Sequence, residues 1–320
     1  MTNVLILGGT GWLSGRIARR WLDAGAAVTC LARGTRPVPD GATLVRGDRD
    51  RPDAYADLAG AWDVVVDISS QAAHVGEAVD VLGERAARWV FVSSMSVYAD
   101  DATVGADESA PLHAPARPGD EYDYAAEKVA AENHVGRLGD RALIVRPGLI
   151  VGDGDPSDRF GYWAAAFARA GDGAVLVPPQ EERDCQVIDV DDLAAFLVET
   201  SLTGVVNAIG SRHPLAEVLA GIRDAAEHTG AVVEAGEPWL VDHGVEHWAG
   251  ERSLPLWLPA EMTGFMTRSN AAYVRAGGGL RPIAETIARV LEDERARGID
   301  RERRAGLTRT DELALLDALA

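Results

Sequence analysis

The hydrophobic positions in the first half of the chain alternate between two periods. Continuous apolar runs bounded by glycine or polar residues are typical of strands buried on both faces, whereas apolar positions three and four apart predict helices. Strands alternating with helices at this spacing predict parallel βαβ units, and hence an α/β protein with a doubly wound parallel sheet. The expected strands cover residues 3–7, 27–32, 42–46, 62–68, 88–93 and 142–147, and the expected helices 12–24, 53–59, 76–87 and 121–138.

The pattern loosens after about residue 150, where short strands and helices follow one another without the earlier regularity. Residues 237–260 concentrate tryptophan, histidine and proline, a composition typical of loops that wall a ligand pocket or form the core of a small subdomain. We therefore expect one domain over 1–150 and a smaller subdomain over 151–320, some segments of which return to the first sheet. Further helices are expected at 160–170, 282–297 and 308–319.

The amino-acid composition excludes several classes of binding partner. The chain has 31 lysine and arginine residues against 50 aspartate and glutamate residues, a net charge of −19, which argues against binding to nucleic acid or to an anionic membrane surface. No apolar run reaches the ~20 residues of a membrane helix, and the amino terminus does not resemble a signal peptide. Cys30 and Cys185 lack paired spacing, and no pair among His74, His113, His134 and His213 has metal-ligand spacing. A cytoplasmic protein with no metal site is expected.

A glycine-rich turn, Gly8-Gly-Thr-Gly-Trp-Leu-Ser-Gly15, follows the first expected strand and opens a helix. A dinucleotide pyrophosphate approaches the backbone closely in such a turn, where a Cβ would block it. The helix N-terminus then offers free N–H groups and the positive end of its dipole. An ordinary tight turn is the alternative, but the position before regular strand–helix alternation favours a dinucleotide-binding domain over 1–150.

The residues at the end of the second expected strand indicate whether NAD(H) or NADP(H) binds. An acidic residue there would bind the ribose 2′-hydroxyl of NAD and repel a 2′-phosphate. The sequence has instead Ala32-Arg33-Gly34-Thr35-Arg36, and an arginine binds phosphate through charge-assisted hydrogen bonds. NADP(H) is therefore favoured over NAD(H), with Arg33 as the phosphate ligand; the alternative is that Arg33 stacks on the adenine or points into solvent.

Tyr124 and Lys128 stand four residues apart on an expected helix and so share a face. A tyrosine has a pKa of ~10, and a neighbouring cation lowers it, which makes the pair a plausible proton donor to a carbonyl oxygen. Ser93 and Ser94 end the fifth expected strand, at the edge where doubly wound sheets bind ligands. A serine hydroxyl there could orient a substrate oxygen toward the tyrosine, or could cap the strand end.

The glycine turn, the Ser-Ser-x-x-Val-Tyr run at 93–98 and Tyr124-x-x-x-Lys128 together resemble the short-chain dehydrogenase/reductase superfamily, which has a Rossmann fold. The nearest resemblance is to its extended or atypical branch, the NAD-dependent epimerase/dehydratase family, over nearly the whole chain. This resemblance implies that Ser94, Tyr124 and Lys128 are catalytic. The cofactor residues that it implies are Gly8, Thr10, Gly11, Trp12, Leu13, Arg33, Asp48, Ile68, Ser69, Ser93, Tyr124, Lys128, Pro147, Gly148 and Leu149.

Four positions depart from the family pattern or leave their role open. Ser14 replaces the third glycine of the motif, which implies a slightly displaced helix. Met95 and Ser96 stand where dehydratases of the family carry Asp-Glu, which disfavours water elimination. Arg183 resembles the residue that grips a diphosphate in sugar-nucleotide members, but a structural salt bridge to the acids of 189–192 is an equal alternative.

The sequence supports three hypotheses. The first is an NAD(P)-dependent oxidoreductase that transfers hydride between nicotinamide and a ketone or secondary alcohol carbon. The second is a nucleotide-sugar epimerase that retains NAD, and the third is a non-catalytic NADP(H)-binding sensor or scaffold. A small-molecule substrate, either a sugar nucleotide or an apolar or aromatic carbonyl compound, would bind mainly to 151–320, and the family often forms homodimers. Candidates to wall its pocket are Trp163, Trp239, Trp248 and Trp257, although a place in the core is the favoured alternative for each of them.

Overall fold

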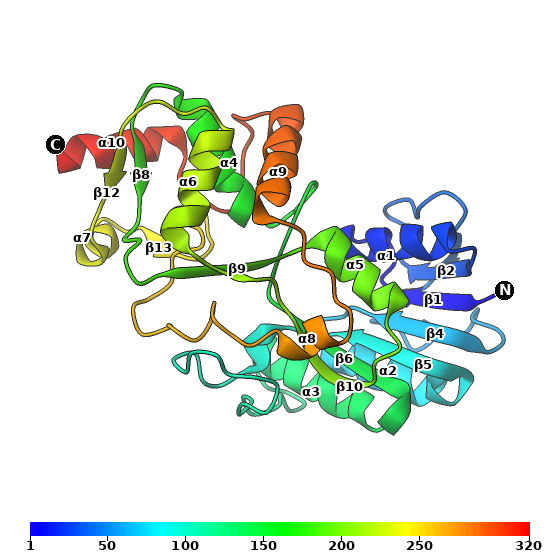
Figure 1. The fold of residues 1–320 in the computed structure, drawn as a ribbon. Helices are drawn as coiled ribbons and strands as arrows, with labels where there is room; N and C mark the ends of the chain where they lie inside the picture. Colours follow the sequence, from blue (N-terminus) through cyan, green and yellow to red (C-terminus); the bar gives the residue numbers. More distant parts are fainter. The chain divides into compact units, whose positions relative to one another are not determined.

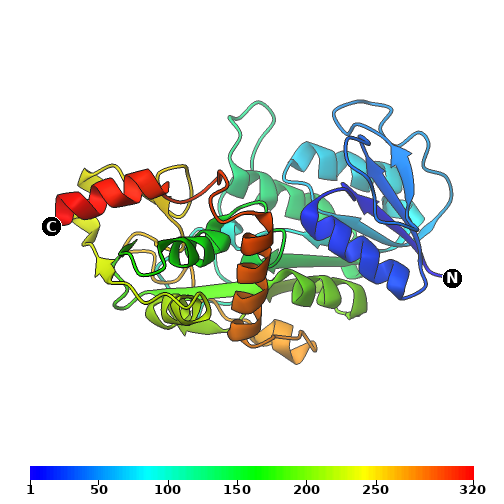
Figure 2. The ribbon, with the colours of Figure 1, turned by 90° about the horizontal axis from the view of Figure 1, so that it is seen from above.

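The computed structural model describes residues 1–320 as two compact units, each assembled from several segments of the chain (Figures 1 and 2). None of its helices combines the length and apolarity required to cross a membrane. The first unit comprises Met1–Leu149, Val190–Gly210 and Arg268–Gly279, and the second Ile150–Asp189, Ser211–Thr267 and Leu280–Ala320.

The first unit is built on a parallel sheet of seven strands in the order β10-β6-β5-β4-β1-β2-β3. The sheet is doubly wound, because α2 packs with α3 and α1 with α5, on opposite faces (Figure 1). Its strands are β1 (Asn3–Leu7), β2 (Ala27–Ala32), β3 (Thr43–Arg46), β4 (Trp62–Asp67), β5 (Ala86–Val92), β6 (Ala142–Pro147) and β10 (Gly204–Ala208). Its helices are α1 (Trp12–Asp23), α2 (Ala72–Leu82), α3 (Tyr124–Gly136), α5 (Val190–Glu199) and α8 (Ala271–Arg275).

The apolar runs of the sequence become the buried centre of this sheet, which confirms the predicted fold class and six of its strands. In β1 the four residues after Asn3 are almost completely buried, as expected for a strand covered by helices on both faces. The expected helix over 53–59 is wrong, because these residues form turns. Their apolar side chains Tyr55 and Leu58 still enter the core, so the helical spacing reflects burial in a short connection rather than a helix.

The second unit combines small sheets with five helices. Antiparallel β11 (Arg212–Pro214) lies beside β9 (Asp184–Asp189), whose other neighbour is β7 (Leu149–Val151); β8 (Val175–Val177) pairs with β12 (Val232–Glu234). A two-residue pair joins β13 (Glu246–His247) and β14 (Ser253–Leu254). The helices are α4 (Arg159–Ala170), α6 (Leu215–Ala225), α7 (Glu237–Asp242), α9 (Ile283–Arg297) and α10 (Arg309–Leu319).

Two of the four tryptophans considered as pocket walls belong to the core of the second unit. Trp163 and Trp257 are fully buried, and the indole N–H of Trp163 donates to the carbonyl oxygen of Pro255 at 2.7 Å. Trp239 and Trp248 remain partly exposed. Of the two alternatives for these tryptophans, the core is therefore confirmed for Trp163 and Trp257, because large apolar side chains fill the interior of this small unit.

Gly9 is required by the packing of the glycine turn against β2. A Cβ on Gly9 would lie 2.5 Å from the Sγ of Cys30, whereas a Cβ on Gly15 would meet no atom within 4 Å. We expect Gly9→Ala to lower the free energy of unfolding by about 1–3 kcal/mol, because overpacking forces the backbone to move. Gly15→Ala, the matched control inside α1, should leave stability unchanged or raise it by up to about 1 kcal/mol. Urea unfolding measures both, and equal stabilities of the two variants would contradict this account.

Candidate active site

The glycine turn between β1 and α1 is closed by a serine hydroxyl. Ser14 is buried, and its Oγ donates to the carbonyl oxygen of Gly8 at 2.8 Å and accepts from the N–H of Gly11 at 2.9 Å. Gly8 has a φ of +84°, in the left-handed region that favours glycine, and a Cβ there would meet no atom within 4 Å. The serine that replaces the third glycine therefore links the two ends of the turn, and the space beside Gly8 is open.

The residues predicted to hold a dinucleotide lie where parallel strands of the first unit end, at one edge of its sheet. Leu13, Pro147 and Leu149 are buried, so their side chains belong to the core of this edge. Arg33 is exposed. Along the chain, Gly8, Thr10, Gly11, Trp12 and Leu13 follow β1, Arg33 follows β2, Asp48 follows β3, Ile68 and Ser69 follow β4, Ser93 and Ser94 follow β5, and Pro147, Gly148 and Leu149 stand at the end of β6.

Lys128 is the only lysine in the sequence, and its side chain is buried at this edge, with 3% of the residue exposed. Its Nζ donates to the carbonyl oxygens of Ser69 at 2.8 Å and Val92 at 2.6 Å, which anchors α3 to the ends of β4 and β5. Burial lowers the pKa of Lys128 to about 8, although the charges of Asp67 and Glu132 oppose this shift. An ammonium group has three protons, so one remains for a further acceptor.

Tyr124 stands at the first position of α3 because the preceding residue caps the helix. The carboxylate of Asp123 accepts from the N–H of Ala126 at 2.7 Å, as an N-cap residue does. The Tyr124 residue is 41% exposed, and its ring centroid lies 6.0 Å from the Nζ of Lys128. The helix thus presents an accessible phenol next to a buried ammonium.

Ser94 follows β5 and caps the short 3₁₀ helix η2 (Met95–Val97), which packs against α3. Its Oγ accepts from the N–H of Ser96 at 3.1 Å and also forms a 3.1 Å hydrogen bond with the hydroxyl of Ser96. The backbone contact fixes the oxygen, while a hydroxyl proton can rotate toward another acceptor. Both interpretations of this serine, a cap and a donor to a ligand, are compatible with that geometry.

A buried polar network beneath these residues escaped the sequence analysis. Glu132 accepts from the guanidinium of Arg146 at 2.9 and 2.6 Å and from the Oγ of Ser93 at 2.6 Å. Arg146 also donates to the hydroxyl of Tyr98 at 3.0 Å, and Tyr98 donates to Asn207 at 2.6 Å. The one signal in the sequence was the position of Glu132, four residues after Lys128 on the same helix face. This network ties α3 to β5, β6 and β10.

A second buried ion pair lies at the end of β4. The guanidinium of Arg49 donates to both carboxylate oxygens of Asp67 at 2.8 Å, and also to the hydroxyl of Tyr55 at 3.0 Å. Burial alone would raise the pKa of Asp67, but the adjacent Arg49 outweighs burial and lowers it. The carboxylate therefore stays ionised near Lys128. The carboxylate of Asp48, the neighbour of Arg49 expected at the adenine, accepts from the N–H of Asp50 at 3.3 Å.

In the second unit, Arg183 does not bind the acids of 189–192 as one alternative required. Its guanidinium donates to Glu237 at 2.8 Å. The carboxylate of Asp189 accepts instead from Thr286 at 2.9 Å and lies 3.4 Å from Arg281. The salt-bridge alternative had the right type of contact but the wrong partner, which lies 54 residues away in the sequence. No cluster of three or more histidine, cysteine or acidic side chains is arranged to hold a metal ion.

Known proteins resemble the chain in sequence and in fold. The sequence model of the NAD dependent epimerase/dehydratase family matches residues 4–82 and 77–204. The 2'-dehydrokanamycin reductase of Streptomyces kanamyceticus is 32% identical over 233 residues, which are 66% of this chain and 62% of the relative. Two solved structures each cover 93% of this chain and are covered completely by it. UDP-glucose 4-epimerase from Thermus thermophilus, complexed with NAD, has a TM-score of 0.65 and 20% identity, and RMD from Pseudomonas aeruginosa, complexed with NADPH, has 0.66 and 19%.

The doubly wound sheet, its glycine turn and these matches define a Rossmann-fold enzyme of the short-chain dehydrogenase/reductase superfamily. Within that superfamily, the chain belongs to the NAD dependent epimerase/dehydratase family.

Because Lys128 is the only lysine, its titration can be followed without assignment. In protein labelled with ¹³C at lysine Cε, we expect one lysine NMR signal that titrates near pH 8, as burial lowers its pKa. In urea the same signal should titrate near ~10.4. Between these values the unfolded chain binds more protons than the folded one, so this group makes the free energy of unfolding rise with pH from about 8 to 10.5. Titration of the folded protein above pH 10 would contradict the assignment.

Proposed function

We propose that the chain is an NADP(H)-dependent reductase that converts a ketone to a secondary alcohol, with Tyr124 as the proton donor. The observation that carries this proposal is the anchoring of Lys128 to the ends of β4 and β5, since it fixes the helix on which Tyr124 is exposed. A phenol beside a buried ammonium is suited to proton transfer near neutral pH. The alternative of a non-catalytic NADP(H) sensor gives no role to this pair.

The first unit fits a dinucleotide at the carboxyl edge of its sheet. The open space beside Gly8 and the N-terminus of α1 suit a pyrophosphate. The remaining proton of Lys128 would bind a ribose hydroxyl of the nicotinamide nucleotide. Arg33, exposed after β2 with no acidic residue beside it, suits the 2′-phosphate of NADP(H). The solved relatives contain NAD in one case and NADPH in the other, so the choice rests on Arg33.

When bound, the reduced nicotinamide supplies the hydride that reaches the carbonyl carbon. Ser94 would hold the carbonyl oxygen with its hydroxyl, whose oxygen is fixed by Ser96. Tyr124 would transfer its phenolic proton to the same oxygen as negative charge develops there. Lys128 would stabilise the resulting phenolate through its charge until a proton from solvent restores the phenol. Met95 is buried where a dehydratase would need a carboxylate, so water elimination has no acid here.

The relative named 2'-dehydrokanamycin reductase supports reduction of a keto group on a sugar-like ring. The second candidate is an epimerase that oxidises and re-reduces a sugar nucleotide, which the family and the structural likeness to UDP-glucose 4-epimerase allow. An epimerase recycles its cofactor and so retains it. Release of unmodified NADP⁺ in proportion to product supports the reductase, whereas NAD that stays bound throughout purification supports the epimerase.

We expect Tyr124→Phe to lower turnover at least about 100-fold, because the proton donor is lost, and to leave NADPH affinity within about twofold. Tyr122→Phe is the matched control, since Tyr122 is exposed two residues earlier and lies outside α3. Turnover is followed as NADPH oxidation with keto-aminoglycosides, and affinity by fluorescence titration. Full turnover in Tyr124→Phe would exclude the proposed mechanism.

We expect Arg33→Ala to raise the KM for NADPH about tenfold or more and to leave the KM for NADH unchanged, because only NADPH carries the 2′-phosphate. Arg117→Ala removes an exposed arginine from another loop of the first unit and controls for the change in net charge. Steady-state kinetics with both cofactors measures the effect. An equal rise for NADPH and NADH would show that Arg33 does not read the 2′-phosphate.

A further inference from the structure

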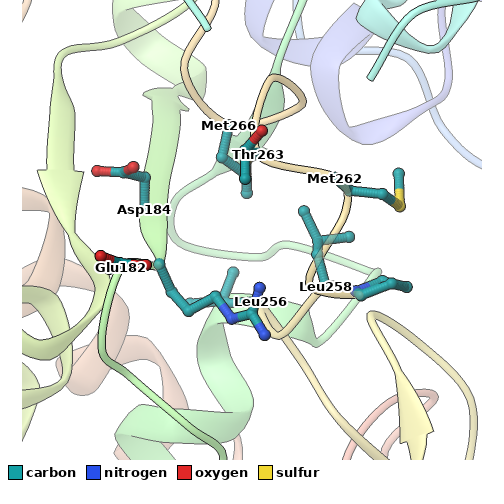
Figure 3. Close-up of a pocket in the computed structure, with 9 residues that line it drawn as sticks. Glu182, Asp184, Leu256, Leu258, Met262, Thr263 and Met266 are labelled. Atoms are coloured by element: carbon teal, nitrogen blue, oxygen red, sulfur yellow. The ribbon is translucent and has the colours of Figure 1, made fainter. Parts of the chain in front are cut away.

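The pocket at the start of β9 in the second unit is too small for a substrate. Its cavity of about 20 Å³ has room for one water molecule. Figure 3 shows that the carboxylates of Glu182 and Asp184 point away from this cavity. Exposed arginine side chains, which suit an anionic ligand, lie instead in the first unit, where β2 and β3 end.

Arg46, the last residue of β3, lies level with the end of β2. The two strands are parallel, and Ala32 pairs with Arg46 in their register. The N–H of Gly47 donates to the carbonyl oxygen of Ala32 at 3.1 Å, so the backbone at Arg46 is fixed to the strand that precedes Arg33. In a dinucleotide-binding sheet, the end of the second strand is where the ribose of the adenosine binds.

Gly34 leaves room for the side chain of Arg46. Gly34 has a φ of +80°, and a Cβ there would lie 3.0 Å from the Nε of Arg46 and 3.5 Å from its Cγ and Cδ. The Arg46 side chain therefore runs along the backbone of the residue that follows Arg33. A glycine at this position adopts the left-handed turn and also admits the second arginine.

The guanidinium groups of Arg33 and Arg46 are available to an anion. Both residues are exposed, and neither forms an ion pair. The first two acids after Arg46 in the sequence have partners of their own. Asp48 accepts from the N–H of Asp50 at 3.3 Å, and Asp50 lies 2.8 Å from the Nε2 of His74. Two cations on neighbouring strands match the double charge of a phosphate monoester better than one does.

We infer that Arg46 is a second ligand of the 2′-phosphate of NADP(H), acting together with Arg33. One guanidinium follows β2 and the other ends β3, so the phosphate would be bound from both strands. As a statement about cofactor choice, this role rests on the proposed use of NADP(H). It adds a specificity-determining residue that lies outside the loop after β2, and it can be measured by binding alone, without substrate or turnover.

The test is calorimetric titration of the whole chain with adenosine 2′,5′-bisphosphate and with AMP, which differ only in the 2′-phosphate. We expect Arg46→Ala to weaken binding of the bisphosphate about tenfold, because a charge-assisted hydrogen-bond donor is lost. Binding of AMP should stay within about twofold. Arg46→Lys keeps the charge but not the planar fork, so its affinity for the bisphosphate should fall between those of wild type and Arg46→Ala.

Arg51→Ala is the matched control, since it removes an equal charge from the segment that follows β3. Arg51 is exposed, and its Nε lies 3.4 Å from the carboxylate of Asp53. This variant should change the affinity for neither nucleotide.

Three results would overturn the role of Arg46. The first is an unchanged affinity for the bisphosphate in Arg46→Ala, while Arg33→Ala loses it; the proposed NADP(H) dependence would then stand without Arg46. The second is an equal loss for AMP and the bisphosphate in Arg46→Ala, which would place this arginine on the adenine. The third is an equal loss in Arg51→Ala, which would indicate a diffuse effect of charge.

Failure of the proposed cofactor choice has a different signature. Wild-type protein that binds AMP and the bisphosphate equally well would contradict the preference for NADP(H), and with it the role of Arg46. Failure of the proposed chemistry would appear separately, as turnover retained in Tyr124→Phe.

Discussion

A buried ammonium at the carboxyl edge of a parallel sheet is the constraint on which the site of the first unit depends. Removing an ammonium from water is costly unless hydrogen bonds and opposite charges replace the solvent. Lys128 receives both, from the carbonyl oxygens of Ser69 and Val92 and from the nearby carboxylates of Asp67 and Glu132. Because those carbonyls belong to the ends of two strands, α3 and the phenol at its start are fixed relative to the sheet.

Each of the two carboxylates near Lys128 is itself paired with an arginine. Asp67 and Glu132 each accept two hydrogen bonds from an arginine, Arg49 and Arg146 respectively. A carboxylate paired so completely stays ionised while buried, and its residual field still favours the charged amine. If the arginines were absent, the carboxylates would take up protons and the ammonium would lose its support. The site therefore depends on positive and negative charges that alternate within the interior. Among them, Lys128 is the group whose pKa is lowered by burial to about 8.

The regular spacing of apolar residues made the fold predictable. The polar partners of the site could not be predicted, because they come from residues far apart in the sequence. The strands and the Tyr124–Lys128 face follow from local spacing, because a buried parallel sheet demands continuous apolar runs. The role of Glu132 does not, since its partners come from two other strands. The helix predicted over 53–59 was wrong because helices and short buried connections place apolar residues at similar spacing. Similarly, nothing local in the sequence indicates that Arg183 pairs with Glu237.

The two units hold arginine side chains in opposite ways. Arg33 is exposed after β2 with no acidic residue near it in sequence, whereas Arg183 donates to the carboxylate of Glu237. Under the proposed function, the guanidinium of Arg33 would be available to a cofactor phosphate, whereas a phosphate near Arg183 would have to compete with the carboxylate of Glu237.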